Sequence, residues 1–237
     1  MLLFWHVQAV KAKITTKELF NREPVFNFRN GVLELDTGKF REHSPTDMSS
    51  IQVDYDFDAQ AKCERWTKFI SEIMADREDS MKLLQEMAGY ILFADCSLQK
   101  CFFLMGEGSN GKSVLIDTLS AVFGEDNCST VDISSLASPF DPMRLRYSLV
   151  NFCGETKTNL KEAEARFKAI VTGDKISAAF KGQDAVEFRT RCKMIAAINN
   201  FITSNDVSYA LQRRIMFVRF ERTFKGSDID RDLTKKL

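Results

Sequence analysis

The sequence predicts an α/β protein whose core is a mainly parallel sheet, and three observations support this prediction. From about residue 100 onward, short apolar runs alternate with segments of helical periodicity. The apolar runs are rich in Val, Ile, Leu and Phe without polar alternation, which is typical of strands buried on both faces of a parallel sheet. The first run, residues 101–105, ends in a glycine-rich loop, and an amphipathic helix follows that loop.

The glycine-rich loop matches the pattern G-x-x-x-x-G-K-[ST] between a strand and a helix, which is the context that a phosphate-binding loop requires. Glycine lets the backbone wind closely around a polyphosphate, while successive N–H groups and the helix N-terminus supply positive potential. Lys112 can reach the β- and γ-phosphates, and the Ser113 hydroxyl can hold Mg²⁺. We therefore expect a bound nucleoside triphosphate, held by Gly106, Glu107, Gly108, Ser109, Asn110, Gly111, Lys112 and Ser113.

The remaining elements of this region follow from the same patterns. Further apolar runs predict strands at residues 130–133, 147–153, 193–198 and 215–220, and helical periodicity predicts helices after Lys112 and over residues 160–171. Residues 175–189 differ, because apolar residues alternate on both sides of a polar turn. This alternation predicts a β-hairpin with Lys181 at its tip.

Two smaller segments precede the sheet. Residues 1–58 are expected to form a small β-rich segment, with strands near 25–28, 32–35 and 39–41. Residues 59–97 show helical periodicity in two stretches joined by the polar residues 76–79, which predicts a helical hairpin used for packing or oligomerisation.

Composition restricts the classes of function. The 237 residues contain 33 Lys and Arg and 33 Asp and Glu, so the net charge is zero and any nucleic-acid binding must be local. Six scattered cysteines without a C-x-x-C pair disfavour a zinc site or a disulfide framework. Because no apolar stretch has the length needed to span a bilayer, we expect a cytoplasmic protein without a membrane partner.

Four further residues fit the second half of an ATPase site. Glu155 follows the strand at 147–153, where a carboxylate can polarise water or hold Mg²⁺ through a water. Asn199 follows the strand at 193–198, where a neutral amide can bind the attacking water or the γ-phosphate. Arg213 and Arg214 precede the last strand. They are either surface charge or an arginine finger for the site of a neighbouring subunit, and chemistry alone leaves both interpretations open.

The order of these motifs resembles that of superfamily 3 helicases, a branch of the AAA+ ATPases. The resemblance is carried by the phosphate loop, a strand ending in Glu155, the sequence Thr172-Gly173-Asp174, Asn199, and the arginine pair before a strand. Residues 28–35 also resemble the region that precedes the ATPase in this family. The similarity is closest to the helicase portion of phage, plasmid and large-DNA-virus primase–helicases, and it extends from about residue 25 to the end of the chain.

This resemblance implies a function and a set of roles. Residues 98–222 would form the AAA+ core and residues 223–237 the start of a truncated C-terminal region, in a ring, usually a hexamer, that hydrolyses ATP with Mg²⁺ while moving on single-stranded or forked DNA. Lys112, Ser113, Glu155 and Asn199 would act in one subunit. Arg214, or as second choice Arg213, would be the finger supplied by its neighbour, and Lys181 would contact DNA.

The resemblance also implies a setting, and the sequence departs from the family in two respects. A primase or polymerase domain is expected in the full-length protein, which would act in a bacterium or a virus-infected host cell. The acidic motif of the family often has two adjacent carboxylates, whereas here Gly154 precedes Glu155. The family often has a proline two or three residues after the sensor asparagine, whereas Phe201 and Ile202 stand there after Asn199.

Two other functions remain as alternatives. The first is a ring-forming scaffold or loader that binds nucleotide without unwinding DNA, which the near-neutral charge and short length favour slightly. A kinase with the same loop would leave the lysine-tipped hairpin and the paired arginines unexplained.

Overall fold

The computed structural model describes residues 21, 23–93, 95–155, 162–199, 209–230 and 232–237, with the side chains of Glu155 and Tyr209 excepted. The chain divides into two compact units. The first comprises the described residues of 1–60 and 92–94, and the second those of 61–91 and 95–237. Among the described residues, no helix has the length and apolar character needed to cross a membrane.

The first unit is a small antiparallel sheet. Its strands are β1 (Val25–Phe28), β2 (Gly31–Glu34) and β3 (Phe40–Arg41), paired in that order. The rings of Phe40 and Phe57 stack at 4.8 Å, and a 3-10 turn, η2 (Pro45–Asp47), is tied to β3 by the Arg41–Asp47 ion pair at 2.5 Å. The small β-rich segment predicted before the core is therefore confirmed.

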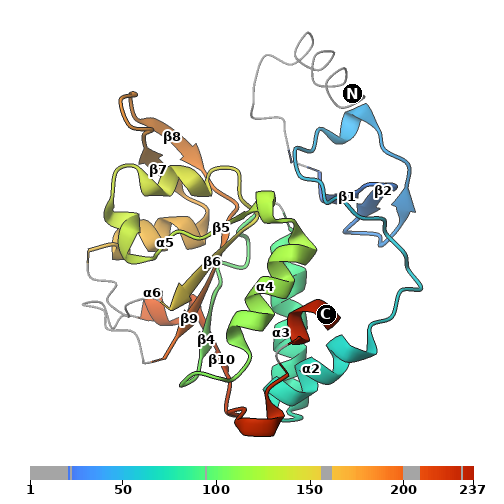
Figure 1. Ribbon diagram of the computed structural model, residues 1–237. Coiled ribbons are helices and arrows are strands. Elements are labelled where there is room, and N and C mark those ends of the chain that lie inside the picture. Colours follow the sequence, from blue (N-terminus) through green and yellow to red (C-terminus); the bar gives the residue numbers. More distant parts are fainter. Residues whose placement is uncertain (1–20, 22, 94, 156–161, 200–208, 231) are drawn as a thin grey trace. The chain divides into compact units, whose positions relative to one another are not determined.

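The second unit is built around a five-stranded parallel sheet (Figure 1). The spatial order is β10 (Ile215–Arg219), β4 (Cys101–Met105), β9 (Lys193–Ile198), β6 (Val150–Glu155) and β5 (Cys128–Ser129). Every neighbouring pair is parallel, with Met105 of β4 opposite Arg219 on one side and Ile198 on the other. The predicted α/β fold with a mainly parallel sheet is confirmed.

Helices cover both faces of this sheet. On one face, Phe103, Met194 and Ala196 belong to the core that also contains Phe167 and Ile170 of α5 (Glu164–Thr172). The opposite side carries α2 (Glu64–Met74), α3 (Glu78–Leu92) and α4 (Lys112–Phe123), as Figure 1 shows. The sheet is thus buried on both sides, which explains why its strands lack polar alternation.

Several element boundaries differ from the sequence predictions. The strand expected at residues 147–153 is β6, which begins later, at Val150, and extends to Glu155. The strand expected at residues 130–133 is wrong, because β5 is Cys128–Ser129 and a 3-10 helix, η4 (Ser134–Ala137), follows. Val131 is buried, but the Asn151 side chain takes the place of a neighbouring strand. Its Oδ1 accepts from Val131 N at 2.7 Å, and its Nδ2 donates to Val131 O at 2.9 Å.

The helices differ from prediction at their starts. The expected polar link at 76–79 is shorter, because α3 already begins at Glu78, where acidic residues in the first turn favour the helix N-terminus. Helix α5 begins at Glu164 rather than near residue 160, and residues 156–161 lie outside the described part of the chain.

The remaining elements complete the second unit. The predicted hairpin consists of β7 (Lys175–Ala178) and β8 (Val186–Arg189), which pair antiparallel. The short elements are α6 (Tyr209–Gln212), α7 (Leu233–Lys236), η3 (Glu125–Asn127), η5 (Asp141–Leu145) and η6 (Gly226–Asp228).

Candidate nucleotide-binding site

The glycine-rich loop joins the carboxyl end of β4 to the first residue of α4, as its sequence predicts. Gly108 (φ 104°), Ser109 (φ 45°) and Gly111 (φ 88°) all have left-handed backbone conformations. A Cβ atom at Gly106 would lie 2.8 Å from the carbonyl oxygen of Phe220, so the close turn requires glycine. A Cβ atom at Gly108 would meet nothing within 4 Å, which leaves that part of the loop open to a ligand.

Lys112 lies inside the loop rather than in solvent. It is 4% exposed, and its Nζ donates to the carbonyl oxygen of Gly106. The same Nζ lies 3.4 Å from Oδ1 of Asn199, although the two residues are 87 positions apart in the sequence. The fold therefore brings together two residues that sequence analysis assigned to one site.

The loop also contains the kinds of groups that a polyphosphate needs. Oδ1 of Asn110 accepts from the backbone N–H of Lys112 at 3.5 Å, whereas its Nδ2 is buried and has no acceptor among the described residues. The N-cap residue of α4, Gly111, has no side chain that could cap the helix, and Ser113 in the first turn is exposed. Uncapped N–H groups and an available hydroxyl fit a phosphate with its bound Mg²⁺.

Glu155 and Asn199 reach the same edge of the sheet as the loop. Asn199 directly follows β9, whose Ile198 pairs with Met105 at the end of β4. Glu155 ends β6 and pairs with Ala197 across a register shift that begins after Cys153. No pattern in the sequence predicts this irregularity at Gly154. It places the backbone of Glu155 at the carboxyl edge, while its side chain lies outside the described part.

The arginine pair lies at the opposite end of the strands, the amino end. Arg214 immediately precedes β10, and its carbonyl oxygen accepts from the N–H of Cys101 at 2.8 Å. Cys101 begins β4 and the phosphate loop follows its end, so five residues at about 3.3 Å each separate the arginines from their own loop by roughly 15 Å. The sheet therefore keeps Arg213 and Arg214 away from the Lys112 of the same chain.

The two arginines differ in their surroundings. Nη1 of Arg214 donates to the carbonyl oxygen of Ala210, and its buried Nε has no acceptor among the described residues. Burial, and to a lesser degree the neighbouring Arg213 charge, lowers the pKa of Arg214. The side chain of Arg213 is exposed, and its carbonyl oxygen accepts from Nζ of Lys100 at 2.5 Å.

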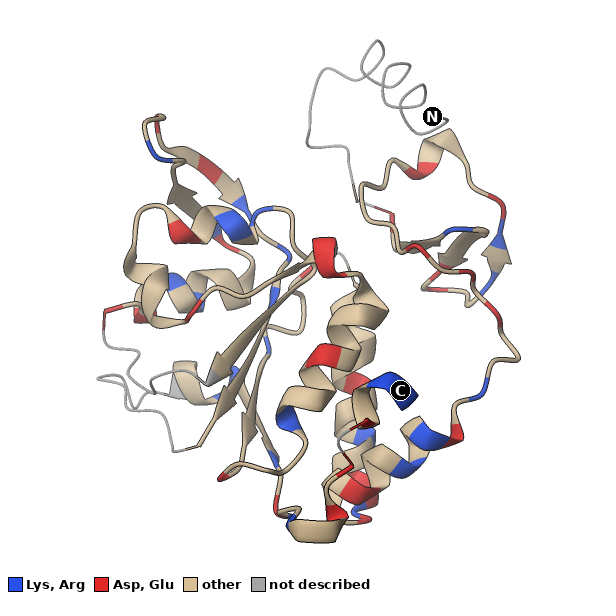
Figure 2. Cartoon of the chain, viewed as in Figure 1, with Lys and Arg blue, Asp and Glu red and all other residues tan. Residues whose placement is uncertain are grey.

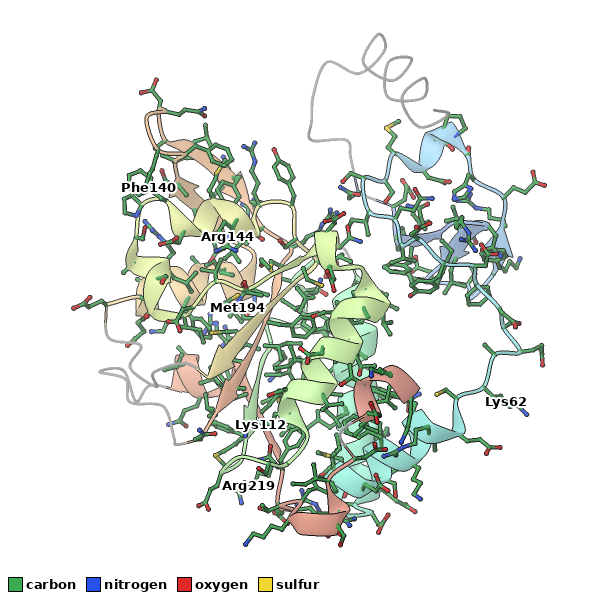
Figure 3. All side chains as sticks on the ribbon, viewed as in Figure 1. Lys62, Lys112, Phe140, Arg144, Met194 and Arg219 are labelled. Carbon is green, nitrogen blue, oxygen red and sulfur yellow. The ribbon has the colours of Figure 1, made fainter. Side chains whose placement is uncertain are left out.

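Sequence analysis missed a segment that borders the loop, residues 219–224. The N–H of Phe220 donates to Met105 O at 2.8 Å, and the N–H of Phe224 donates to Ser109 O at 2.7 Å. Arg77, in the turn between α2 and α3, binds Glu221 and the carbonyl oxygen of Arg219, each at 2.9 Å. In Figure 3, Arg219 and Lys112 lie in the same region at this edge.

Lys181 is exposed beside the turn of the hairpin, where the N–H of Gln183 donates to Phe180 O at 3.0 Å. Phe180 is 51% exposed, and the start of the hairpin turn is held by a 2.9 Å hydrogen bond from the N–H of Ala179 to Pro139 O. Figure 2 shows both signs of charge interspersed along the chain. A contact with DNA phosphates would therefore be local.

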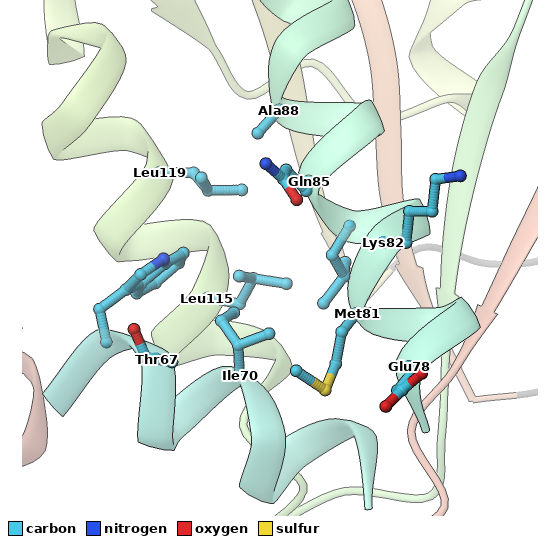
Figure 4. A pocket seen from close by; sticks show the side chains of 11 residues that line it. Thr67, Ile70, Glu78, Met81, Lys82, Gln85, Ala88, Leu115 and Leu119 are labelled. Carbon is cyan, nitrogen blue, oxygen red and sulfur yellow. The ribbon is translucent and has the colours of Figure 1, made fainter. Parts of the chain in front are cut away.

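A cavity of about 460 Å³ lies between α2, α3 and α4 (Figure 4). Ile70, Met81, Leu115 and Leu119 give it an apolar wall, and Glu78, Lys82 and Gln85 also line it. It contains none of the predicted site residues, so the candidate site is the phosphate loop and not this cavity.

Comparisons with known proteins found two matching family models and several similar proteins. Residues 6–75 match the family model "D5 N terminal like", and residues 104–214 match "Family of unknown function (DUF5906)". The second match includes every predicted site residue from Gly106 to Arg214. The chain is 25% identical over 228 residues to the "Putative helicase L207/L206" of Acanthamoeba polyphaga mimivirus, which covers 90% of this chain and 23% of that protein.

The chain is therefore distantly related to a putative viral helicase. The resemblance found from the motifs is confirmed at that level. The "Uncharacterized mitochondrial protein ymf21" of Marchantia polymorpha is 21% identical over 154 residues, covering 60% of this chain and 82% of that protein.

Solved structures share the fold. The apo structure of the NrS-1 C-terminal region superposes with a TM-score of 0.64 at 18% identity, covering 80% of this chain and 46% of that one. The chain therefore spans less than half the length of both this structure and the mimivirus relative.

Proposed function

We propose that this chain is the ATP-driven DNA helicase or translocase part of a phage or mobile-element replication protein. The proposal depends above all on the 3.4 Å approach of Lys112 Nζ to Asn199 Oδ1. This contact joins the phosphate loop to the polar residue after the neighbouring strand, as phosphoryl-transfer sites in parallel sheets require.

The residues at the carboxyl edge divide the tasks of ATP hydrolysis. Lys112 would release its contact with Gly106 and bind the β- and γ-phosphates, and the exposed Ser113 hydroxyl and Glu155 would hold Mg²⁺, partly through water. When bound, ATP would supply the phosphoanhydride bond whose cleavage drives movement, and Mg²⁺ would offset the negative charge of the phosphates. Asn199 would orient the attacking water without adding charge.

The position of the arginine pair supports a site shared between subunits. Because Arg214 lies at the edge opposite its own loop, it would complete the site of the next subunit in a ring. The half-buried guanidinium of Arg214 is better fixed than the exposed one of Arg213, so Arg214 remains the first choice. The hairpin with Lys181 would contact DNA phosphates, a contact that carries no sequence information.

Replacement of Lys112 tests the nucleotide site. Lys112→Ala is expected to abolish ATP hydrolysis and, with it, strand displacement on a forked DNA. Lys62→Ala, at an exposed lysine outside the site, is the matched control and should retain both activities. Circular dichroism would verify that each variant is folded.

The outcome for the wild-type chain separates the alternatives. Strand displacement that depends on ATP supports the helicase. Nucleotide-dependent assembly without strand displacement would support the scaffold or loader instead. If wild type binds no nucleotide at low ionic strength, the proposed function is wrong.

A further inference from the structure

The residues after β10 form one side of the phosphate loop. The flanking segment, as we call residues 219–224, consists of the last residue of β10 and the five residues after it. It hydrogen-bonds to Met105 O, at the end of β4, and to Ser109 O, within the loop. Arg77 fixes the segment through Glu221 and the carbonyl oxygen of Arg219. The segment and the loop are therefore positioned together at the edge where a nucleotide would bind.

The strand order decides which end of a nucleotide faces this segment. Asn199 and Glu155, which would serve the γ-phosphate, follow β9 and β6 on one side of β4. The flanking segment follows β10 on the other side of β4. A nucleotide whose γ-phosphate points toward β9 must extend its nucleoside toward β10.

The flanking segment presents an aromatic ring at this place. Phe220 is only 4% exposed and serves as packing, whereas Phe224 is partly exposed beside Ser109. The guanidinium carbon of Arg222 lies 4.9 Å from the centre of the Phe224 ring. An aromatic ring with a guanidinium on one face can stack a nucleobase on its other face.

We propose that Phe224, supported by Arg222, is the platform that binds the base of the nucleotide. This inference rests on the proposed function, because it assigns the base subsite of the same ATP site. The platform acts on the nucleoside and not on the phosphates, so its contribution is absent for a ligand that has no base.

Two probes that differ in the base test the platform. Binding of ADP and of inorganic tripolyphosphate, each with Mg²⁺, is measured by calorimetry for wild type and for Phe224→Ala. The loss of one stacked base is expected to weaken ADP binding by about 5- to 150-fold. Tripolyphosphate binding should stay within twofold of wild type.

Two further variants control for damage to the fold. Phe224→Tyr keeps an aromatic ring and should restore ADP affinity to within a few fold of wild type. Phe140→Ala removes an exposed phenylalanine that Figure 3 shows well separated from Lys112, and it should leave both affinities unchanged.

The outcomes separate this inference from the proposed function. If Phe224→Ala weakens both ligands equally, or neither, the platform is wrong while the nucleotide site stands. If wild type binds neither ligand, the proposed function fails first. Selective loss of ADP with retained tripolyphosphate, reversed by Phe224→Tyr, supports the platform.

Discussion

At the scale of single residues, Lys193 carries a charge that the fold has buried. It is the first residue of β9 and is 1% exposed, with its Nζ 5.0 Å from the centre of the Tyr90 ring. Burial lowers its pKa from 10.5 to about 8, although nearby Cys96, Cys192 and Asp95 act in the opposite direction. Folding therefore favours the neutral amine.

This shift predicts that stability rises with pH. Between about pH 8 and pH 10.5 the unfolded chain binds a proton at Lys193 that the folded chain releases. The free energy of unfolding of wild type should therefore increase relative to that of Lys193→Met by at most about 1.4 kcal/mol per pH unit. Urea denaturation of both proteins at pH 7.0, 8.5 and 9.5 measures this difference, since the subtraction cancels the titration of groups that do not interact with Lys193. A constant difference across this range would contradict the prediction.

Two glycines with different surroundings give a second prediction. A Cβ atom at Gly106 would clash with the backbone of Phe220, so Gly106→Ala should lower the free energy of unfolding by about 1–3 kcal/mol and weaken ADP binding. A Cβ atom at Gly89, inside α3, meets nothing within 4 Å, so Gly89→Ala should instead raise it by about 0.5–1 kcal/mol. Urea denaturation midpoints compare the two, and equal effects would show that the close approach at Gly106 is unimportant.

At the scale of elements, the pattern of apolar residues predicted the strands that pair with other strands of the sheet. The strands at 101–105 and 193–198 are confirmed to the residue. The prediction of a strand at 130–133 is wrong because the backbone of Val131 hydrogen-bonds to the side chain of Asn151, twenty positions later in the sequence. A side chain that replaces a strand leaves no periodicity in the sequence.

The hairpin formed by β7 and β8 makes a prediction about DNA binding. If Lys181 contacts a DNA phosphate, Lys181→Ala should lower the affinity for single-stranded DNA. It should also reduce the slope of log affinity against log salt concentration by about 0.7. Fluorescence anisotropy with a labelled oligonucleotide at several salt concentrations measures both, with Lys62→Ala as control. An unchanged slope would place the DNA contact elsewhere.

At the scale of the whole molecule, the proposed function assigns one half of a nucleotide site to each end of the strands, with Lys112 at the carboxyl end and Arg214 at the amino end. The phosphate loop of one subunit would require Arg214 from a second copy of the chain. A site shared between two subunits predicts that mixtures of inactive variants regain activity, whereas a site within one chain does not.

Two inactive variants should restore activity when mixed. In a ring assembled at random from equal amounts of Lys112→Ala and Arg214→Ala, about a quarter of the interfaces pair an intact loop with an intact arginine. ATP hydrolysis by the mixture should exceed that of either variant alone, and the same mixture made with Arg213→Ala tests the second choice. Mass measurements with nucleotide and single-stranded DNA establish that the subunits assemble. Assembly without recovery would contradict the shared site.

The sequence by itself determined the phosphate loop, the α/β class, most strands, and the residues that follow them, because local periodicity and short motifs need no distant partner. Only the tertiary structure decided that Lys112 meets Asn199, that the arginines lie at the far edge, and that Phe224 borders the loop. These results depend on the order of parallel strands, which crossover connections set between residues far apart in the chain.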